Sequence, residues 1–167
     1  MKIDQLAYKC LAGMTGIALA AALALPSAAS AGERGKFKGK SVLYSTQYQE
    51  IKSPDGDAAK TVQIGELDGI VFNEMDGGFL DKARYQVVWK GYGNGSSDCQ
   101  KIFTTGKGKV FGYCVGQSDD KGNDEGTITL TGGTDAYQGI KGKGKYKLKM
   151  VSDRLMWDLI EWDYEIP

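Results

Sequence analysis

Glycine-punctuated alternation is the feature of this chain that most restricts its fold, and it is clearest in residues 126–146, GTITLTGGTDAYQGIKGKGKY. Ile128 and Leu130 alternate with threonines, which is the period-two pattern of a strand with one buried face. Gly132 and Gly133 end this run, and a second alternating run follows a compact turn segment. Two strands joined by so much glycine indicate an antiparallel, strongly curved sheet.

Almost all of the chain after residue 39 has the same character, with strand-like runs separated by turn signals. The eight runs cover residues 40–51, 60–74, 83–92, 97–105, 109–117, 125–131, 142–150 and 154–166. Short strands at this spacing are typical of β-sandwiches and closed barrels. We therefore expect one all-β domain over residues 40–167, preceded by a flexible polar segment at residues 32–39.

The first 31 residues have the order of a secretory signal peptide. A weakly basic start precedes an apolar run over residues 10–25, and Ala29, Ser30 and Ala31 provide the small residues that signal peptidase reads. The apolar run is shorter than the roughly 20 residues of a membrane-spanning helix. We expect cleavage after Ala31 and export to the periplasm or the medium, with no integral membrane segment left.

Charge gives no indication of a nucleic-acid partner. The chain carries 21 Lys and Arg residues against 21 Asp and Glu residues, so its formal net charge is zero. A basic surface that tracks phosphates is therefore not expected. The partners that we consider are a small hydrophobic ligand and further copies of the same chain in a homo-oligomer.

Two cysteines, Cys99 and Cys114, follow the predicted signal peptide. Gly106 and Lys107 read as the two-residue turn of a hairpin of the glycine-first type. In that register the two cysteines lie directly opposite each other on adjacent strands, at a separation that a disulfide bridges. In an oxidising compartment we expect a disulfide, and the alternative is a pair of buried free thiols.

The last hairpin gives a further prediction about the interior. If Ser152 and Asp153 form a two-residue turn, one face of this hairpin carries a set of largely apolar side chains with one acid, Glu161. We expect that face to point inward, although a slip of one residue would reverse it. Together with two aromatic residues of the run at 109–117, it supplies the candidate residues for lining a cavity. They are Tyr146, Leu148, Trp157, Leu159, Phe111 and Tyr113.

The stretch from residue 126 to residue 146 resembles a segment of the allene oxide cyclase and dirigent-type barrels. The resemblance lies in GTITLTGG followed by T-x-x-Y-x-G-I-x-G-x-G-x-Y, with Asp135 where the commoner pattern has glycine. It implies a single eight-stranded antiparallel β-barrel of the calycin type with an apolar cavity. The plant members are a cyclase and stereochemical guides for radical coupling. The motif is structural, so no catalytic residue is carried over, and its glycines are Gly132, Gly133, Gly139, Gly142 and Gly144.

The absence of histidine limits the chemistry open to this protein. It removes Ser-His-Asp and Cys-His catalysis and all imidazole metal sites. Residues 119–125 are rich in oxygen ligands but lack the spacing of a calcium loop, so we expect no metal and no cofactor. The one acid of interest is Glu161, predicted to face inward opposite Gly144, where an apolar lumen would raise its pKa. The alternative is a solvated Glu161 at a wet barrel end.

Three functions follow from this reading. The first is binding of a small hydrophobic ligand in the lumen without catalysis, as ligand sites are largely apolar with a few placed polar groups. The second is a cofactor-free isomerase or cyclase in which Glu161 and a tyrosine handle protons. The third is a structural or oligomer-forming module whose barrel is filled by side chains.

Overall fold

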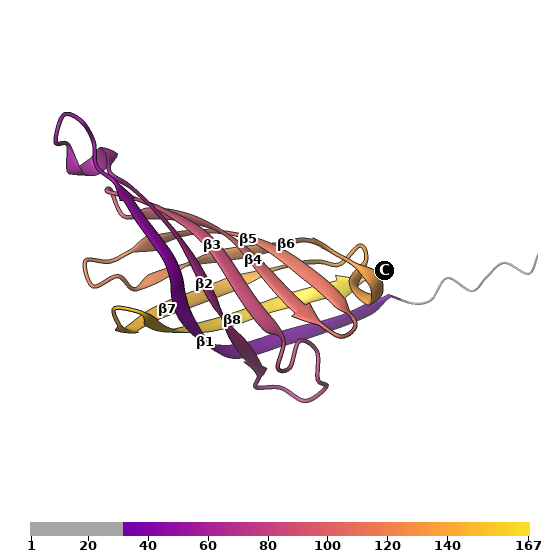
Figure 1. Cartoon of the computed structure of the whole chain (residues 1–167). Coiled ribbons are helices and arrows are strands. Elements are labelled where there is room, and N and C mark those ends of the chain that lie inside the picture. The colour runs from indigo at the N-terminus through magenta and orange to yellow at the C-terminus, as the bar shows by residue number, and fades with distance from the viewer. Residues whose placement is uncertain (1–31) are drawn as a thin grey trace, which may run out of the picture.

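Eight antiparallel strands close into a barrel in the computed structural model, which describes residues 32–167 (Figure 1). Each strand pairs with the next in the chain, and β8 pairs with β1. The predicted signal peptide, residues 1–31, lies outside the described residues. The elements are β1 (Glu33–Ile51), η1 (Ala58–Lys60), β2 (Val62–Asn73), β3 (Arg84–Tyr92), β4 (Ser96–Thr105), β5 (Gly108–Ser118), β6 (Asp124–Gly133), η2 (Asp135–Tyr137), β7 (Lys141–Ser152) and β8 (Leu155–Ile166).

The all-β, eight-stranded barrel predicted from the sequence is therefore confirmed, and one boundary is corrected. Residues 33–39, expected to form a flexible segment, belong to β1, which pairs with β8 from Glu33 opposite Ile166 onward. The physical reason is Phe37, which is fully buried and stacks on Trp162 with ring centroids 4.6 Å apart. Within residues 32–167, no helix has the length and apolar character needed to cross a membrane.

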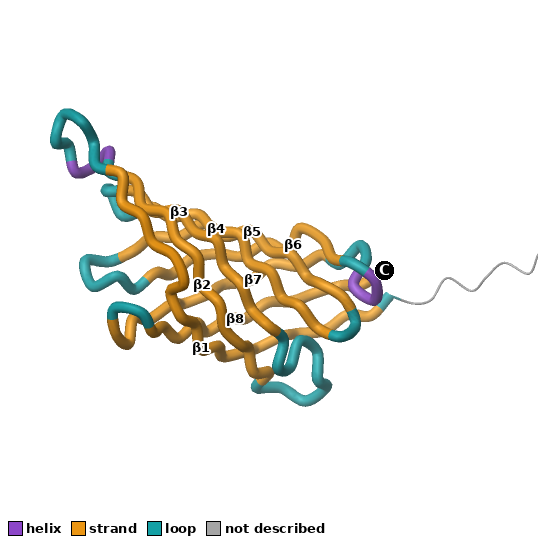
Figure 2. The backbone as a smooth tube through the Cα atoms, viewed as in Figure 1, coloured by secondary structure: helices purple, strands orange, loops and turns teal. Residues whose placement is uncertain are grey.

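The connections between strands lie at two ends of the barrel, which Figure 2 shows at opposite sides of the view. We call them the mouth end and the plugged end. At the mouth end lie the β1–β2, β3–β4, β5–β6 and β7–β8 connections. The β1–β2 hairpin, which carries η1, projects well beyond the others (Figure 1). At the plugged end lie the other three connections and the chain segments that start β1 and end β8.

Aromatic side chains fill the lumen at the plugged end. Phe79, from the β2–β3 connection, stacks on Tyr164 at 4.1 Å and meets Tyr137 of η2 edge-on at 5.7 Å. Phe37 and Phe103 both pack on Trp162, and Phe103 also stacks on Tyr85 at 4.5 Å. Stacked and edge-on pairs of this kind stabilise a core beyond the area that they bury. These rings occupy the lumen in this half of the barrel.

The register predicted for the β4–β5 hairpin is confirmed. Thr105 pairs with Gly108, and Cys99 pairs with Cys114. Both cysteines are buried, and in the structure both are free thiols. The disulfide between them stays a prediction for the oxidised protein.

The register predicted for the β7–β8 hairpin is wrong by one residue. The turn lies at Asp153 and Arg154, and the pairing shifts between Met150 and Ser152, which leaves Val151 unpaired as a bulge. Because side chains alternate strictly along a strand, this shift reverses the faces of β8 while leaving those of β7 as expected. The residues of β8 that point inward are Met156, Asp158, Ile160, Trp162 and Tyr164.

Candidate functional site

A cavity of about 740 Å³ occupies the mouth end of the barrel. Its volume falls within the range of roughly 300–1,000 Å³ that is usual for small-molecule sites. The apolar part of its wall comes from β2, β3, β7 and β8 and comprises Leu67, Val87, Trp89, Leu148, Met150 and Met156. The polar part includes Ser97, Lys101, Asp124 and Tyr146, with several aspartates at the rim.

An ion pair that crosses the lumen separates this cavity from the aromatic plug. Lys101 extends from β4 and Asp158 from β8, which lie on opposite walls because they are four strands apart in a closed eight-stranded barrel. The Lys101 ammonium donates to Asp158 Oδ2 at 2.5 Å, and the two side chains are 1% and 0% exposed. Ser97 and Cys99 lie on the cavity side of this pair along β4, and Phe103 lies on the plug side.

Further groups hold the ion pair in place. The Tyr85 hydroxyl donates to Asp158 Oδ2 at 2.5 Å, and the Ser41 hydroxyl donates to the Asp158 backbone carbonyl at 3.3 Å. The Lys101 ammonium also lies 4.1 Å from the centre of the Tyr146 ring, within cation–π range. Asp158 Oδ1 has no hydrogen-bond partner.

The protonation of this cluster follows from its burial. Burial by itself would lower the pKa of Lys101, but attraction by the Asp158 carboxylate outweighs it and leaves that pKa above its usual value. Burial, followed by the same carboxylate, raises the pKa of Tyr85 well above its ordinary value. At neutral pH the lysine is therefore charged and the tyrosine neutral, so the floor of the cavity holds a fixed ion pair.

A second polar group lines the wall near the mouth. The Tyr146 hydroxyl donates to Asp124 Oδ1 at 2.9 Å, and the Ser118 hydroxyl donates to Asp124 Oδ2 at 3.1 Å. A Cβ at Gly116 would collide with the Tyr146 hydroxyl, so the missing side chain makes room for this contact. Ser97, whose partner across the β4–β5 ladder is Gly116, is buried, and its side chain lies within hydrogen-bonding reach of the Tyr146 hydroxyl. Burial, and then the Asp124 carboxylate, raise the pKa of Tyr146.

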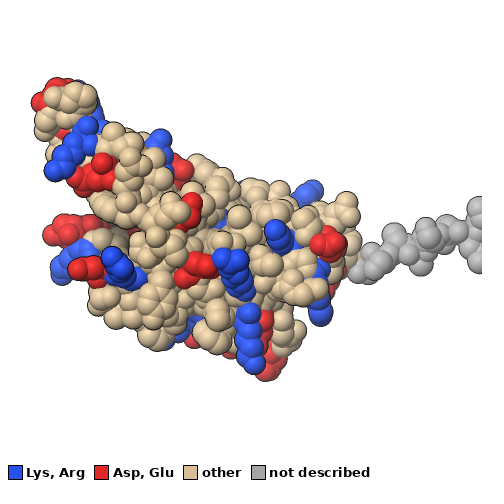
Figure 3. Space-filling view, viewed as in Figure 1, with Lys and Arg blue, Asp and Glu red and all other residues tan. Residues whose placement is uncertain are grey.

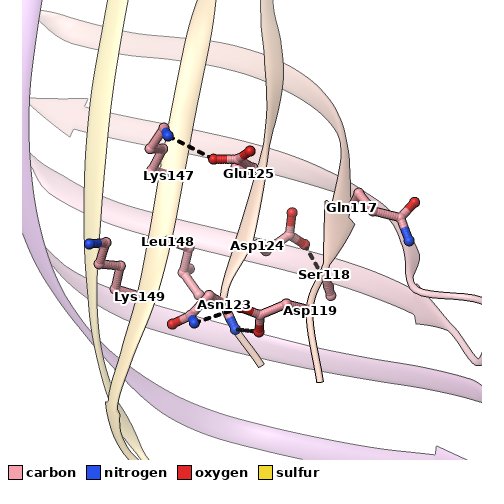
Figure 4. Close-up of a pocket in the computed structure, with 9 residues that line it drawn as sticks. All are labelled: Gln117, Ser118, Asp119, Asn123, Asp124, Glu125, Lys147, Leu148 and Lys149. Carbon is pink, nitrogen blue, oxygen red and sulfur yellow. Dashed lines mark hydrogen bonds and ion pairs between the residues drawn. The ribbon is translucent and has the colours of Figure 1, made fainter. Parts of the chain in front are cut away.

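The β5–β6 loop forms one side of the rim, beside a shallow outer hollow of about 460 Å³ (Figure 4). In this loop the Asp119 carboxylate accepts hydrogen bonds from the Asn123 side chain at 2.8 Å and from the Lys121 backbone at 2.9 Å. On the outer face, Lys147 forms an ion pair with Glu125 at 2.8 Å. Over residues 32–167 no cluster of three or more Cys, Asp and Glu residues could hold a metal ion.

The structure separates the predicted cavity residues into two groups. Tyr146 and Leu148 lie in the cavity wall. Trp157 and Leu159 lie outside because the faces of β8 are reversed, and the Lys40 ammonium lies 3.8 Å above the Trp157 ring. The remaining two, Phe111 and Tyr113, also point outward, since Val110, Gly112 and Cys114 occupy the inward positions of β5.

The inward placement predicted for Glu161 is wrong as well. Its side chain is exposed on the outer surface and forms an ion pair with Lys145 at 3.7 Å. The same one-residue shift of β8 accounts for this, and it puts Asp158 into the lumen instead. The lumen therefore contains an acid, but not the one that sequence reasoning selected.

Sequence reasoning missed Lys101, Asp158 and Ser97. A signal for two of them was present, because the register that places Cys99 opposite Cys114 also gives Ser97 and Lys101 the same face of β4 as Cys99. Asp158 could not be found in this way, since the register of β8 depends on the bulge.

Comparison with known proteins bears on the fold. No family model matches the chain, and no curated protein matches it. Among solved structures it is similar to the pterocarpan synthase dirigent protein GePTS1, with a TM-score of 0.52 and 12% sequence identity. The match covers 82% of this chain and 91% of that one. The chain has a dirigent-like barrel fold. The resemblance read from the motif at residues 126–146 is thus confirmed for the architecture.

Proposed function

We propose that this dirigent-like barrel binds a small, mostly apolar molecule in the mouth-end cavity and holds it without making or breaking bonds. The observation that supports this proposal is the cavity of about 740 Å³ above a tightly filled lower half. A barrel that served only as a structural module would gain stability by filling this space with side chains, because apolar wall residues such as Trp89 and Leu148 would then be removed from water. The similar solved structure is named a dirigent protein, which fits a role in holding or guiding a molecule.

The isomerase alternative finds less support in the lumen. An efficient general acid or base has a pKa near the working pH. The pKa values of Lys101, Tyr85 and Tyr146 are instead raised further from neutrality. Glu161, the acid on which that alternative depended, is outside the barrel.

Two substitutions at neighbouring positions of β3 test the proposal. Val87 lines the cavity, whereas Val88 points outward and is 45% exposed. We expect the neutral fluorophore N-phenylnaphthylamine to bind the wild-type protein saturably. Val87→Trp should weaken this binding at least about tenfold, a loss of about 1.4 kcal/mol, because the indole fills the space. Val88→Trp is the matched control and should bind as the wild type does, with circular dichroism showing that both variants fold. Unchanged binding by Val87→Trp would contradict the proposal.

Export and the cysteine pair form a second part of the proposal. We infer that the protein is exported to the periplasm or the medium, where the compartment's thiol oxidants join Cys99 to Cys114 with loss of two hydrogens. Such a bond, closing a loop of 15 or so residues, would stabilise the barrel by about 3 kcal/mol. The intact mass of the protein from its own host should correspond to a chain beginning at Gly32 and lacking those two hydrogens. A retained N-terminus or two free thiols would contradict this part alone.

A further inference from the structure

Two aromatic rings line the cavity at its mouth. They belong to Tyr48 of β1 and Trp89 of β3, and both residues pair with Gly65 of β2, which lies between them in the sheet. Their ring centroids are 6.2 Å apart. A Cβ at Gly65 would collide with the Trp89 indole, so the missing side chain lets one face of the indole rest on the wall. The other face is then directed to the cavity, and we call the two rings the aromatic platform.

The aromatic platform has no partner for its exposed surface. Tyr48 is 57% exposed, and Trp89 is half-buried. The faces of indole and phenol rings attract cations, and the indole does so most strongly. Elsewhere in residues 32–167 lysine ammonium groups lie over four other rings, those of Trp157, Tyr92, Tyr85 and Tyr146, but none lies over the platform. The platform is therefore open to a positively charged group that comes from outside the chain.

Four aspartates line the cavity from the β5–β6 and β7–β8 ends of the barrel. They are Asp119, Asp120, Asp124 and Asp153. Asp119 and Asp124 accept hydrogen bonds from neutral donors, among them Asn123 and Ser118 (Figure 4). Such bonds orient a carboxylate but leave its charge in place. None of the ion pairs among residues 32–167 includes any of the four aspartates.

The positive charges of the cavity do not balance these aspartates. Lys101 is already neutralised by Asp158 at the floor. Arg154, which is exposed at the rim, is the other cationic residue of the lining. A mouth with excess negative charge raises the local concentration of cations and lowers that of anions. The charge of the mouth therefore favours the same kind of group as the aromatic platform does.

The aromatic platform and the aspartates of the β5–β6 connection lie on opposite walls. The platform belongs to β1 and β3, and β5 is four strands from β1 in a closed eight-stranded barrel. Deeper in the cavity the wall is apolar, above the ion pair of the floor. This apolar belt consists of Leu67, Val87, Leu148 and Met156. From floor to mouth, the cavity thus changes from apolar to aromatic and acidic.

We propose that the cavity takes an organic cation, an apolar molecule that carries one protonated amine or quaternary ammonium group. This inference rests on the proposed binding function and specifies the ligand class. The apolar body lies in the belt, and the ammonium lies between the aromatic platform and the aspartates. A neutral molecule of the same shape gains only the apolar contacts, and an anion is repelled at the mouth.

Three naphthalene compounds that differ in charge test this ligand class. Naphthylmethylamine is protonated at pH 7, naphthylmethanol is uncharged and naphthoate is an anion. Binding to the full mature protein is measured by titration calorimetry. We expect the amine to bind at least about tenfold more tightly than the alcohol, and naphthoate more weakly than either. Added salt should weaken binding of the amine and leave that of the alcohol unchanged, because exposed charges are screened.

Neutralising two aspartates isolates the contribution of charge. Asp120 and Asp153 are suitable because they are exposed, whereas Asp119 and Asp124 hold the loop through hydrogen bonds. The double variant Asp120→Asn/Asp153→Asn should weaken binding of the amine about threefold or more and leave the alcohol unchanged. The matched control is Glu74→Gln/Asp76→Asn, which removes two exposed charges from the β2–β3 connection at the plugged end and should change neither.

Trp89→Leu tests the aromatic platform. The amine and the alcohol lose the same apolar contact in this variant, so the ratio of their affinities reports the attraction of the ring for the charge. That ratio should fall about two- to fivefold, the range for a cation–π contact at an exposed site. Trp157→Leu, which removes an indole from the outer surface, is the matched control. Circular dichroism verifies that both variants fold.

The outcomes separate this inference from the proposed function. If the alcohol or naphthoate binds as tightly as the amine, or if neither the aspartate variant nor Trp89→Leu reduces the preference for the amine, the ligand class is wrong while binding in the cavity stands. If Val87→Trp leaves binding of the amine unchanged, the cation adheres to the outer surface and the inference is wrong. If none of the three compounds binds the wild-type protein, the inference and the proposed function are both wrong.

Discussion

The Lys101 side chain carries its charge across the lumen to Asp158, and this single contact sets the depth of the cavity. Two buried charges are expensive to desolvate, and a well-packed apolar pair is often as stable. What the ion pair provides is a fixed floor for the cavity. Lys101 is held against the Tyr146 ring and Asp158 is held by the Tyr85 hydroxyl, so neither side chain can move into the cavity. Removal of one partner should therefore cost far more than removal of both.

Lys101→Met should lower the free energy of unfolding by about 3–5 kcal/mol, since it leaves the Asp158 carboxylate buried without its cation. The double variant Lys101→Met/Asp158→Leu should recover most of that loss. The measurement is urea unfolding at pH 7, with Lys147→Met as control because the Lys147–Glu125 pair is exposed and worth about 1 kcal/mol or less. If the single and double variants lost the same free energy of unfolding, the ion pair would stabilise the barrel more than an apolar pair does, and the prediction would be contradicted.

At the scale of elements, the two hairpins show what a sequence can and cannot specify. The β4–β5 turn is a two-residue, glycine-first turn, so its register follows from the turn alone and correctly pairs Cys99 with Cys114. The β7–β8 hairpin carries a bulge at Val151, which no turn rule predicts, and the faces of β8 are reversed as a result. Every error in the predicted interior of β8 follows from that one residue.

The β6–β7 connection shows that a motif can predict architecture without local detail. Asp135 has a φ of +54°, in the left-handed region that glycine favours and that aspartate tolerates better than most residues. This explains why the commoner pattern has glycine there. At Gly144, a Cβ would collide with the backbone of Glu161 and Trp162, so β7 and β8 approach closely at that point. Such needs for glycine predict a curved sheet, but not which side chains line the cavity.

At the scale of the whole molecule, one half of the barrel provides most of the packing and the other half carries the proposed binding site. The aromatic plug and the cross-lumen ion pair supply a rigid lower half, while the mouth half keeps a cavity, an aromatic platform and an acidic rim. On the face seen in Figure 3, basic and acidic side chains are interspersed rather than gathered into a patch of one sign. This distribution agrees with the balanced composition and offers no surface for a polyanion on that face.

Three tyrosines inside the barrel determine how its stability depends on pH. Burial, followed by the hydrogen bond to Glu33, raises the pKa of Tyr164 to about 12 from 10.0, and burial raises the pKa of Tyr85 and Tyr146 in the same direction. Above pH 10 an unfolded tyrosine loses its proton while the folded one keeps it. The folded state then binds more protons, so the free energy of unfolding must fall as pH rises.

In the disulfide-bonded protein, stability should thus be nearly constant from pH 7 to about pH 9 and fall above pH 10, with a slope approaching about 1.4 kcal/mol per pH unit for each such tyrosine and for Lys101, whose pKa is also raised. With free thiols the fall would begin about one pH unit lower, because burial raises the pKa of Cys114 as well. Urea unfolding followed by circular dichroism between pH 7 and 11.5 measures this directly. Tyr164→Phe removes one titrating hydroxyl. Between pH 10 and 11.5 its free energy of unfolding should therefore fall less steeply than that of the wild type, by up to about 1.4 kcal/mol per pH unit, which corresponds to one proton. A wild-type curve that stays flat to pH 11.5 would contradict the prediction, because it would mean that these hydroxyls ionise as readily in the folded barrel as in the unfolded chain.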